Sequence, residues 1–331
     1  MAQDKGMIVV TGAAGFIGSN HVAELNRRGE ENILVVDELG ADEHWKNLRG
    51  LRFADYLQSG EFREAFNTDG ACPPIRAVYH LGACSSTTET DADYLVDNNF
   101  RYTQELCGFC IRTGARFVYA SSAATYGDGD RGYDDDLSRI DTLRPVNMYG
   151  MSKQLFDLWA RGKGLFGEIA GLKYFNVYGP HEDFKGDMRS VIHKAYGQIL
   201  ATGKVRLFKS HRDGYADGEQ LRDFVYVKDA VDMTLHCGEH RECSGLFNCG
   251  TGRARSWNAL AKAVFAAMGR EPNIEYIDMP EHLRAKYQYF TQAEMSRARA
   301  AGYTHEFTSL EDGVRDYVQN YLIPCTDGGV A

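Results

Sequence analysis

Tyr149 and Lys153 form the pair with the most chemical potential in this sequence. A spacing of four residues places both side chains on one face of a helix. A tyrosine normally loses its proton near pH ~10, and a lysine cation close by favours the phenolate and lowers that pKa. A fall of about 3 units corresponds to roughly 4 kcal/mol and would let Tyr149 accept a proton near neutral pH. The pair therefore suggests alcohol oxidation, although Tyr-x-x-x-Lys also arises by chance on exposed helices.

A glycine-rich turn upstream of this pair has the features of a dinucleotide site. Gly12, Gly15 and Gly18 directly follow the apolar run Met7–Val10 and open a helical pattern over Ile17–Arg28. The first glycine allows a tight turn, the second lets the backbone approach a pyrophosphate, and the third allows close helix–strand packing. The spacing is G-x-x-G-x-x-G rather than G-x-G-x-x-G. The turn predicts a nicotinamide dinucleotide beside the Tyr–Lys pair.

The residues around this turn indicate where phosphate and ribose would bind. The amides of Phe16 and Ile17 open the helix and would point at a phosphate. Asp37 ends the second apolar run, 25 residues past Gly12, where an acid can bind a ribose hydroxyl. An acid that only ends a strand is the alternative. Glu38 complicates the cofactor choice, because a carboxylate about 4 Å from a 2′-phosphate costs up to about 4 kcal/mol at an effective dielectric of about 20.

The segments that must position these residues alternate between strands and helices. Helices are expected over Ile17–Arg28 and Leu95–Arg112, and a third, over Ser152–Arg161, carries Lys153. This alternation predicts an α/β fold: a Rossmann doubly wound parallel sheet with a smaller α/β substrate-binding lobe. Strands are expected at Met7–Val10, Ile33–Val36, Ala77–Leu81, Arg116–Ala120, Leu172–Phe175, Arg222–Val227 and Leu246–Gly250.

The length of 331 residues is sufficient for one large domain with a smaller lobe. The pattern of short strands breaks after Asn176 and returns later in the chain. We therefore expect residues 1–176 and 223–252 to form a dinucleotide-binding domain. Residues 177–222 and 253–331 are expected to form a substrate-binding domain.

Charge and hydropathy argue against several classes of partner. The net charge is −9, from 37 basic and 46 acidic residues, whereas nucleic-acid binding through the phosphate backbone needs a basic footprint. No apolar run approaches the length of a membrane span, and Met7–Val10 is too short for a signal segment. The eight cysteines have no second pair at zinc spacing, so no metal site is predicted. We expect a cytoplasmic protein that binds neither nucleic acid nor membrane.

Longer runs make the sequence similar to a known family over nearly the whole chain. Two of them, Gly82–Glu89 and Tyr287–Ala293, are the more family-specific. With these runs the chain resembles the extended short-chain dehydrogenases/reductases of the NAD-dependent epimerase/dehydratase superfamily, and among them the family of ADP-heptose 6-epimerases. The other matching runs are Val10–Asn20, Tyr119–Gly127, Tyr174–Pro180, Arg222–Val227 and Asn248–Ala254.

The resemblance implies an epimerase that causes no net redox change. A tightly bound NADP would accept a hydride from C6″ of ADP-D-glycero-heptose, and the hydride would return to the other face of the transient ketone, in lipopolysaccharide heptose precursor synthesis. Inversion needs proton transfer on both faces, and Tyr149 and Lys185 match the family's two bases. Ser122 would hydrogen-bond the reacting hydroxyl, and Lys153 would anchor the nicotinamide ribose. Without the resemblance, Lys185 would be taken for a plain loop lysine.

The resemblance also implies which residues bind each ligand, and it implies a homo-oligomer, a pentamer. Arg222 is the natural partner of the substrate pyrophosphate, because it is charged and can bind bidentately. The cofactor residues would be Gly12, Gly15, Phe16, Ile17, Gly18, Asp37, Glu38, His44, Leu81, Gly82, Ala83, Cys84, Ser85, Asn98, Lys153, Val177 and Lys185. The substrate residues would be Asn176, Asp187, His193, Phe208, Lys209, Ser210, His211, Arg222 and Tyr287.

The chain departs from the family pattern at the cofactor end and in the substrate pocket. His44 stands where the family often has a lysine for the 2′-phosphate, and Asp37-Glu38 replaces a less acidic pair. NAD therefore stays open beside NADP. Asp187 stands where a serine commonly contacts substrate, and Lys209-Ser210-His211 replaces Glu-Gly-Ser.

Two other functions compete with this interpretation. A related sugar-nucleotide 4-epimerase shares the core machinery and is the alternative enzyme. A 4,6-dehydratase is disfavoured, because Ala123-Ala124 stands where dehydratases carry an Asp-Glu pair that moves protons. A non-enzymatic, cofactor-sensing protein on this fold is disfavoured by the intact set of Ser122, Tyr149 and Lys153.

Overall fold

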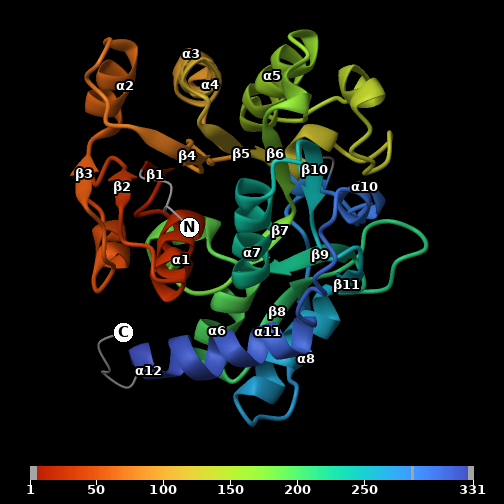
Figure 1. Cartoon of the computed structure of the whole chain (residues 1–331). Helices are drawn as coiled ribbons and strands as arrows, with labels where there is room; N and C mark the ends of the chain where they lie inside the picture. Colours follow the sequence, from red (N-terminus) through yellow and green to blue (C-terminus); the bar gives the residue numbers. More distant parts are fainter. Residues whose placement is uncertain (1–5, 285–286, 327–331) are drawn as a thin grey trace.

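A seven-stranded parallel sheet forms the centre of the molecule in the computed structural model, which describes residues 6–284 and 287–326 (Figure 1). The strand order is β10-β6-β5-β4-β1-β2-β3, and every neighbouring pair is parallel. This confirms the predicted α/β Rossmann fold. The strands are β1 (Met7–Thr11), β2 (Ile33–Val36), β3 (Asp55–Leu57), β4 (Ile75–His80), β5 (Arg116–Ser122), β6 (Ala170–Tyr174) and β10 (Gly245–Cys249).

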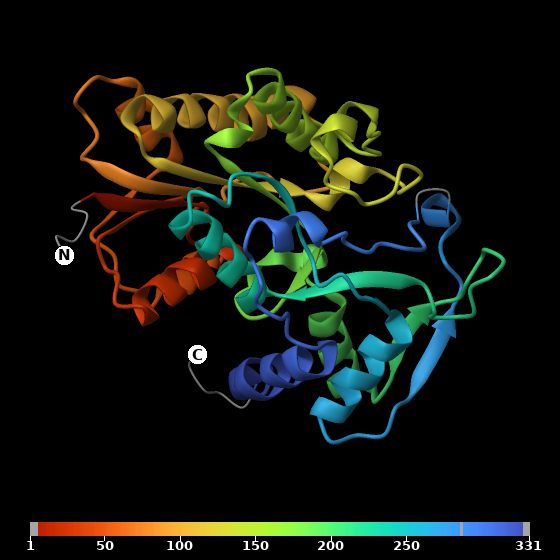
Figure 2. The same ribbon diagram turned by 45° about the vertical axis from the view of Figure 1, so that its right-hand side comes forward.

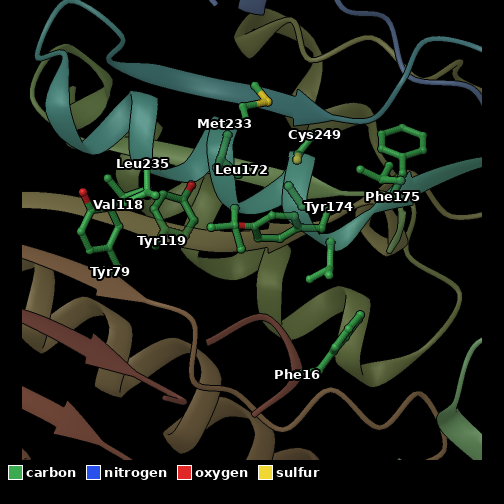
Figure 3. Close-up of a cluster of buried hydrophobic side chains, with 14 of the residues drawn as sticks. Phe16, Tyr79, Val118, Tyr119, Leu172, Tyr174, Phe175, Met233, Leu235 and Cys249 are labelled. Carbon is green, nitrogen blue, oxygen red and sulfur yellow. The ribbon is translucent and has the colours of Figure 1, made fainter. Parts of the chain in front are cut away.

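Helices cover both faces of this sheet, which explains why its inner strands are almost continuously apolar. Figures 1 and 2 show helices on both faces of the sheet, with the α2, α3, α4 and α5 labels on one face and the α1 and α7 labels on the other. Figure 3 shows Met233 and Leu235 lying over Val118 and Leu172 in the core between the sheet and the helices on its second face. The first face carries α2 (Ser59–Asn67), α3 (Ala92–Leu95), α4 (Tyr102–Thr113) and α5 (Met148–Gly162), with the π-helix η2 (Val96–Arg101) between α3 and α4. The second face carries α1 (Phe16–Arg27) and α7 (Val227–Glu239).

The smaller lobe is built on two short sheets and three helices. The three-stranded sheet has the order β11-β9-β7, and a separate parallel pair joins β12 to β8. Their bounds are β7 (Asn176–Tyr178), β8 (Val205–Phe208), β9 (Leu221–Tyr226), β11 (Ala254–Ser256) and β12 (Ile274–Ile277). The helices are α6 (Val191–Thr202), α8 (Trp257–Ala267) and α11 (Leu310–Tyr317).

Short helical segments complete the chain. Of the described helices, none is both long and apolar enough to span a membrane. The remaining α-helices are α9 (Glu281–Arg284), α10 (Ser296–Ala300) and α12 (Ile323–Thr326). The 3₁₀ and π segments are η1 (His44–Leu48), η3 (Ala123–Tyr126), η4 (Leu137–Thr142), η5 (Leu165–Gly167), η6 (Asp183–Met188) and η7 (Val318–Leu322).

Several expected boundaries differ by a few residues from the observed elements, and two of these differences bear on the site and the domains. Helix α5 begins at Met148 rather than Ser152, because the Asn147 side chain caps it and accepts a hydrogen bond from the Gly150 amide at 2.8 Å. The strand expected from residue 222 is β9, which lies in the smaller sheet, so the expected domain boundary at residue 223 falls inside a strand. The two-domain division remains our proposal, and residues 1–5, 285–286 and 327–331, which it includes, lie outside the described part.

Candidate active site

One large cavity runs along the carboxyl ends of the central strands and reaches the smaller lobe. Its volume is about 1080 Å³, which exceeds the ~300–1,000 Å³ of most single-ligand pockets. It lies at the crevice beside β1, where the strand order reverses between β4 and β2. The cavity is therefore large enough for a dinucleotide and a second ligand side by side.

The glycine turn after β1 forms the floor of this cavity and fits a pyrophosphate. Gly12 has φ +66°, a conformation that favours glycine. A Cβ on Gly18 would lie 1.9 Å from the Gly12 carbonyl oxygen, so any side chain there would separate α1 from the turn. In the described chain no side chain caps α1, and its first amides are left for an anion. The residues present therefore fit the cofactor that the turn predicts.

Three carboxylates lie at the end of the cavity beyond β2. Asp37 Oδ2 accepts a hydrogen bond from the Ala14 amide at 2.7 Å. Burial raises the pKa of Asp37, and hydrogen bonds from the backbone of Glu38 and Ala14 oppose that rise. Asp42 and His44 also line this end and contact each other through the imidazole Nδ1. The predicted residues Asp37, Glu38 and His44 are thus brought together.

The Leu81–Ser85 loop after β4 lines the cavity as expected, and Asn99 holds it in place. Asn99 Oδ1 accepts from the Cys84 amide and its Nδ2 donates to the Cys84 carbonyl, both at 2.9 Å. The same Nδ2 also donates to Ser152 Oγ on α5 at 3.0 Å. The predicted Asn98 lies outside the cavity lining and donates to Asn99 Oδ1. Asn99 also lies outside the lining and was not named from sequence, and the cofactor role of Asn98 stays a prediction.

Tyr149, Ser122 and Lys153 meet at the centre of the cavity. Burial raises the pKa of Tyr149, and a hydrogen bond with Ser122 opposes the rise. The expected fall in the pKa of Tyr149 is therefore wrong, because the pKa is raised. The physical reason is that removing water destabilises the phenolate by more than its hydrogen bond stabilises it. Tyr149 is protonated near neutral pH in this state.

Two lysines of the cavity have lost part of their hydration. Burial lowers the pKa of Lys153 to about 8, and the charge of Asp157 opposes this. Lys185 comes from η6, on the other lobe, and its Nζ lies 4.9 Å from the centre of the Phe16 ring. Burial also lowers the pKa of Lys185. A lysine with a lowered pKa can exchange a proton closer to neutral pH than an exposed one.

The substrate-lobe end of the cavity is aromatic and contains a buried arginine. The Arg222 guanidinium lies 5.7 Å from the Trp257 ring centre and 5.3 Å from that of Tyr287. Trp257 Nε1 donates to the Tyr287 hydroxyl at 2.8 Å. Arg222 and Tyr287 were predicted, whereas Trp257 was missed because it opens α8, whose pattern is that of an ordinary packed helix. A buried guanidinium between two rings is suited to an anionic group.

The structure does not bring every predicted substrate residue to the cavity. Asn176 and Val177 of β7 line it together with Lys185, Arg222 and Tyr287. Phe208 lies behind the lining, with its ring centre 6.4 Å from that of Tyr287. Roles in substrate binding stay predictions for the residues outside the lining. These are Asp187, His193, Phe208, Lys209, Ser210 and His211.

Comparison with known proteins shows which families this chain is similar to. Residues 8–250 match the family described as "NAD dependent epimerase/dehydratase family". The chain is 56% identical over 316 residues to an ADP-L-glycero-D-manno-heptose-6-epimerase of Nitratidesulfovibrio vulgaris, covering 96% of this chain and 98% of that one. It is 48% identical to the protein of the same name from Fusobacterium nucleatum, with the same coverage. The crystal structure of the Helicobacter pylori ADP-L-glycero-D-manno-heptose-6-epimerase superposes with a TM-score of 0.80 at 26% identity, over 97% of this chain and 98% of that one.

Proposed function

This chain belongs to the NAD dependent epimerase/dehydratase family, and we propose that this epimerase inverts C6″ of ADP-D-glycero-D-manno-heptose to give the L-glycero form. The names of its relatives at 56% and 48% identity over nearly their whole length support this substrate. The product would serve the synthesis of heptose precursors of lipopolysaccharide. Ala123 and Ala124, which line the cavity beside Ser122 and carry no acid or base, support epimerisation over dehydration.

The observation that carries the proposal is that Tyr149 and Lys185 reach one cavity from two different lobes. Inversion requires one proton exchanger on each face of the reacting carbon. Burial raises the pKa of the Tyr149 phenol and lowers that of the Lys185 amine, so the phenol holds its proton more tightly than in water and the amine holds its proton less tightly. We assign Tyr149 and Lys185 as the two bases.

The neighbouring residues would orient the reacting hydroxyl and the cofactor. A bound oxidised nicotinamide would supply reversible hydride acceptance at this site. Ser122 hydrogen-bonds Tyr149 in the free chain, and we propose that it also holds the hydroxyl of the substrate. We assign Lys153 to the nicotinamide ribose, where it would keep a positive charge beside the phenol. Arg222 would bind the pyrophosphate of the substrate.

We further propose, from the resemblance, that the enzyme works in the cytoplasm as a homopentamer with a tightly bound dinucleotide. Light scattering of the purified protein tests the oligomeric state. The resemblance implied NADP as the cofactor, and the acidic ribose end weighs against that choice.

An NMR time course with two substrates tests the proposed reaction. ADP-D-glycero-heptose and UDP-galactose are incubated separately with the purified enzyme, and we expect epimers to interconvert only in the first. Inversion of UDP-galactose alone would contradict the heptose assignment and favour the 4-epimerase.

A double variant tests the two-base assignment. Tyr149→Phe combined with Lys185→Met should abolish epimerisation, because no proton exchanger would remain on either face. Lys194→Met is the matched control, since Lys194 lies nearby on α6 but outside the cavity lining. Turnover near the wild-type rate in the double variant would refute the assignment.

A further inference from the structure

We propose that this chain selects NAD over NADP, and that Glu38 is the residue that determines this specificity. The inference rests on the proposed function only in taking the cavity to bind a nicotinamide dinucleotide. The side chains at the ribose end distinguish the two cofactors of that class, NAD and NADP. These side chains are Asp37, Glu38, Asp42 and His44, and all four line the cavity.

Asp37 sets the location of the ribose. It directly follows β2, where dinucleotide-binding folds place the acid that binds the 2′-hydroxyl. Its Oδ1 and Oδ2 accept backbone amides of Glu38 and Ala14 at 2.8 and 2.7 Å, so the carboxylate is held in one orientation. A carboxylate has about four acceptor positions, which leaves capacity for a ribose hydroxyl. A phosphate monoester at the same position has no proton to donate and carries like charge.

Glu38 adds a second negative charge that cannot swing away freely. Its Oε1 accepts the amides of Ser59 and Gly60, at 2.9 and 3.4 Å, in the first turn of α2. Amides at a helix N-terminus are the groups that most readily bind a phosphate. Glu38 is therefore anchored by these two amides at the edge of the cavity, where its charge would repel a 2′-phosphate.

The basic side chains nearby do not offset these charges. His44 stands where the resemblance places a lysine for the phosphate, but Asp42 accepts from both its amide, at 3.0 Å, and its ring Nδ1. Lys185 lies over the Phe16 ring instead. The Arg189 guanidinium donates to the Asp183 carbonyl. Within the described lining, three carboxylates thus face one imidazole at this end of the cavity.

Two measurements on the purified wild-type protein test the selection directly. Denaturation should release NAD, identified by mass, rather than NADP. After removal of bound nucleotide, calorimetric titration should give a Kd at least about 100-fold lower for NAD than for NADP. Equal affinities, or tighter NADP binding, would overturn the inference while leaving the proposed epimerisation intact. Absence of binding by either nucleotide would instead refute the dinucleotide site and with it the proposed function.

One variant and a matched control test the role of Glu38. Glu38→Gln keeps the side-chain length and an acceptor for the Ser59 amide, and it should raise NADP affinity about 10-fold while changing NAD affinity less than about 3-fold. Glu43→Gln is the control, because Glu43 pairs with Lys46 and lies outside the cavity lining. The ratio of NAD affinity to NADP affinity in this variant should match that of the wild type. Added salt should also narrow the wild-type ratio, since screening weakens repulsion. If neither Glu38→Gln nor added salt changed the NAD-to-NADP affinity ratio, the preference for NAD would come from the shape of the site, and the charge mechanism would be refuted.

Discussion

Lys173 of the large sheet and Arg222 of the three-stranded sheet are both buried cations, and their charges are accommodated in opposite ways. Lys173, on β6 of the large sheet, is fully buried beside the equally buried Asp157 of α5. Its Nζ lies 2.9 Å from Asp157 Oδ2 and 2.5 Å from Thr125 Oγ1. Asp157 also accepts hydrogen bonds from Tyr119 and Ser121 at 2.7 and 2.8 Å. This cation is neutralised inside the fold.

Arg222, on β9 of the three-stranded sheet, is buried without such a partner. Its guanidinium donates to the backbone carbonyls of Leu221 and Gln288, and in the described chain no carboxylate lies within ion-pair distance of it. Burial lowers the pKa of Arg222. Arg222 lines the cavity whereas Lys173 does not.

The presence or absence of a buried carboxylate partner helps to distinguish a structural cation from one that can bind an anionic ligand. Taking an unpaired charge out of water is costly, and the cost is offset when an opposite charge enters the site. The fold supplies that charge to Lys173 through Asp157. Arg222 has no such partner in the described chain and lines the cavity, so we propose that an anionic ligand supplies the charge, and a pyrophosphate is the group that the resemblance favours.

The largest effect that would test this comparison is on stability. Lys173→Met leaves the Asp157 carboxylate buried and uncompensated, so the free energy of unfolding should fall by about 3–5 kcal/mol. Urea unfolding followed by circular dichroism measures this change. The double variant Lys173→Met with Asp157→Leu removes both charges and should recover most of the loss. A single variant as stable as wild type would show that the pair is not neutralised as described.

Arg222→Met should have the opposite profile, with a large loss of affinity and little loss of stability. We expect the Kd for an ADP-sugar to rise at least about 100-fold, or roughly 2.7 kcal/mol, because a charge-assisted contact with the pyrophosphate disappears. The free energy of unfolding should stay within about 1 kcal/mol of wild type, because no buried carboxylate is left alone.

A neighbouring arginine provides the control for that measurement. Arg255 lies opposite Arg222 in the β11–β9 pairing but is bound to Glu311 at the surface. Arg255→Met should leave the Kd unchanged. If Arg222→Met unfolded the protein without changing affinity, Arg222 would be structural and the contrast with Lys173 would fail.

Most of the residues that line the nucleotide side of the cavity could be named from sequence. Its parts are local: Gly12 and Gly18 lie in one turn, and Asp37 ends the next strand. Backbone geometry fixes their roles, so the pattern alone specifies the contacts. The short strands β3 and β7 were missed, because three residues are too few to show a period.

The substrate side could be predicted only in part, because distant segments assemble it. Arg222 and Tyr287 were expected from the resemblance, but their contact with Trp257 depends on how β9, α8 and a later loop pack together. The pKa of Tyr149 was predicted in the wrong direction for a related reason. Spacing on a helix gives the neighbour Lys153 but not the burial of the phenol, and burial dominates.

Lys153 is another buried cation, and its removal should stabilise the protein. Its pKa is about 8 in the folded chain and 10.5 ordinarily, so the unfolded chain binds the proton more tightly. Protonation therefore opposes folding fully below pH ~8, and the cost disappears as pH rises past ~10.5. Lys153→Met should raise the free energy of unfolding at pH 7 by up to about 3 kcal/mol and should lose activity.

The pH dependence distinguishes this effect from better packing. The gain of Lys153→Met over wild type should shrink between pH 8 and 10.5, whereas a packing gain would not depend on pH. Lys163→Met, at the exposed end of the same helix, should show no gain at any pH. A stability gain of equal size at pH 7 and pH 10.5 would contradict the burial cost assigned to Lys153.

Trp257 gives the smallest expected effect and tests whether the Arg222 site is built by its rings. Trp257→Phe keeps an aromatic face but loses the indole donor to Tyr287 and part of the cation–π contact. We expect KM for the ADP-sugar to rise about 3–10-fold with kcat unchanged, because such contacts contribute about 0.5–2 kcal/mol. Quenching of tryptophan fluorescence by the ligand should also fall.

Trp159→Phe is the control, since Trp159 packs on Phe156 outside the cavity lining and should keep the wild-type KM. If KM changed in Trp159→Phe but not in Trp257→Phe, the anion site would not depend on its aromatic walls, and Arg222 would be held by its backbone contacts alone.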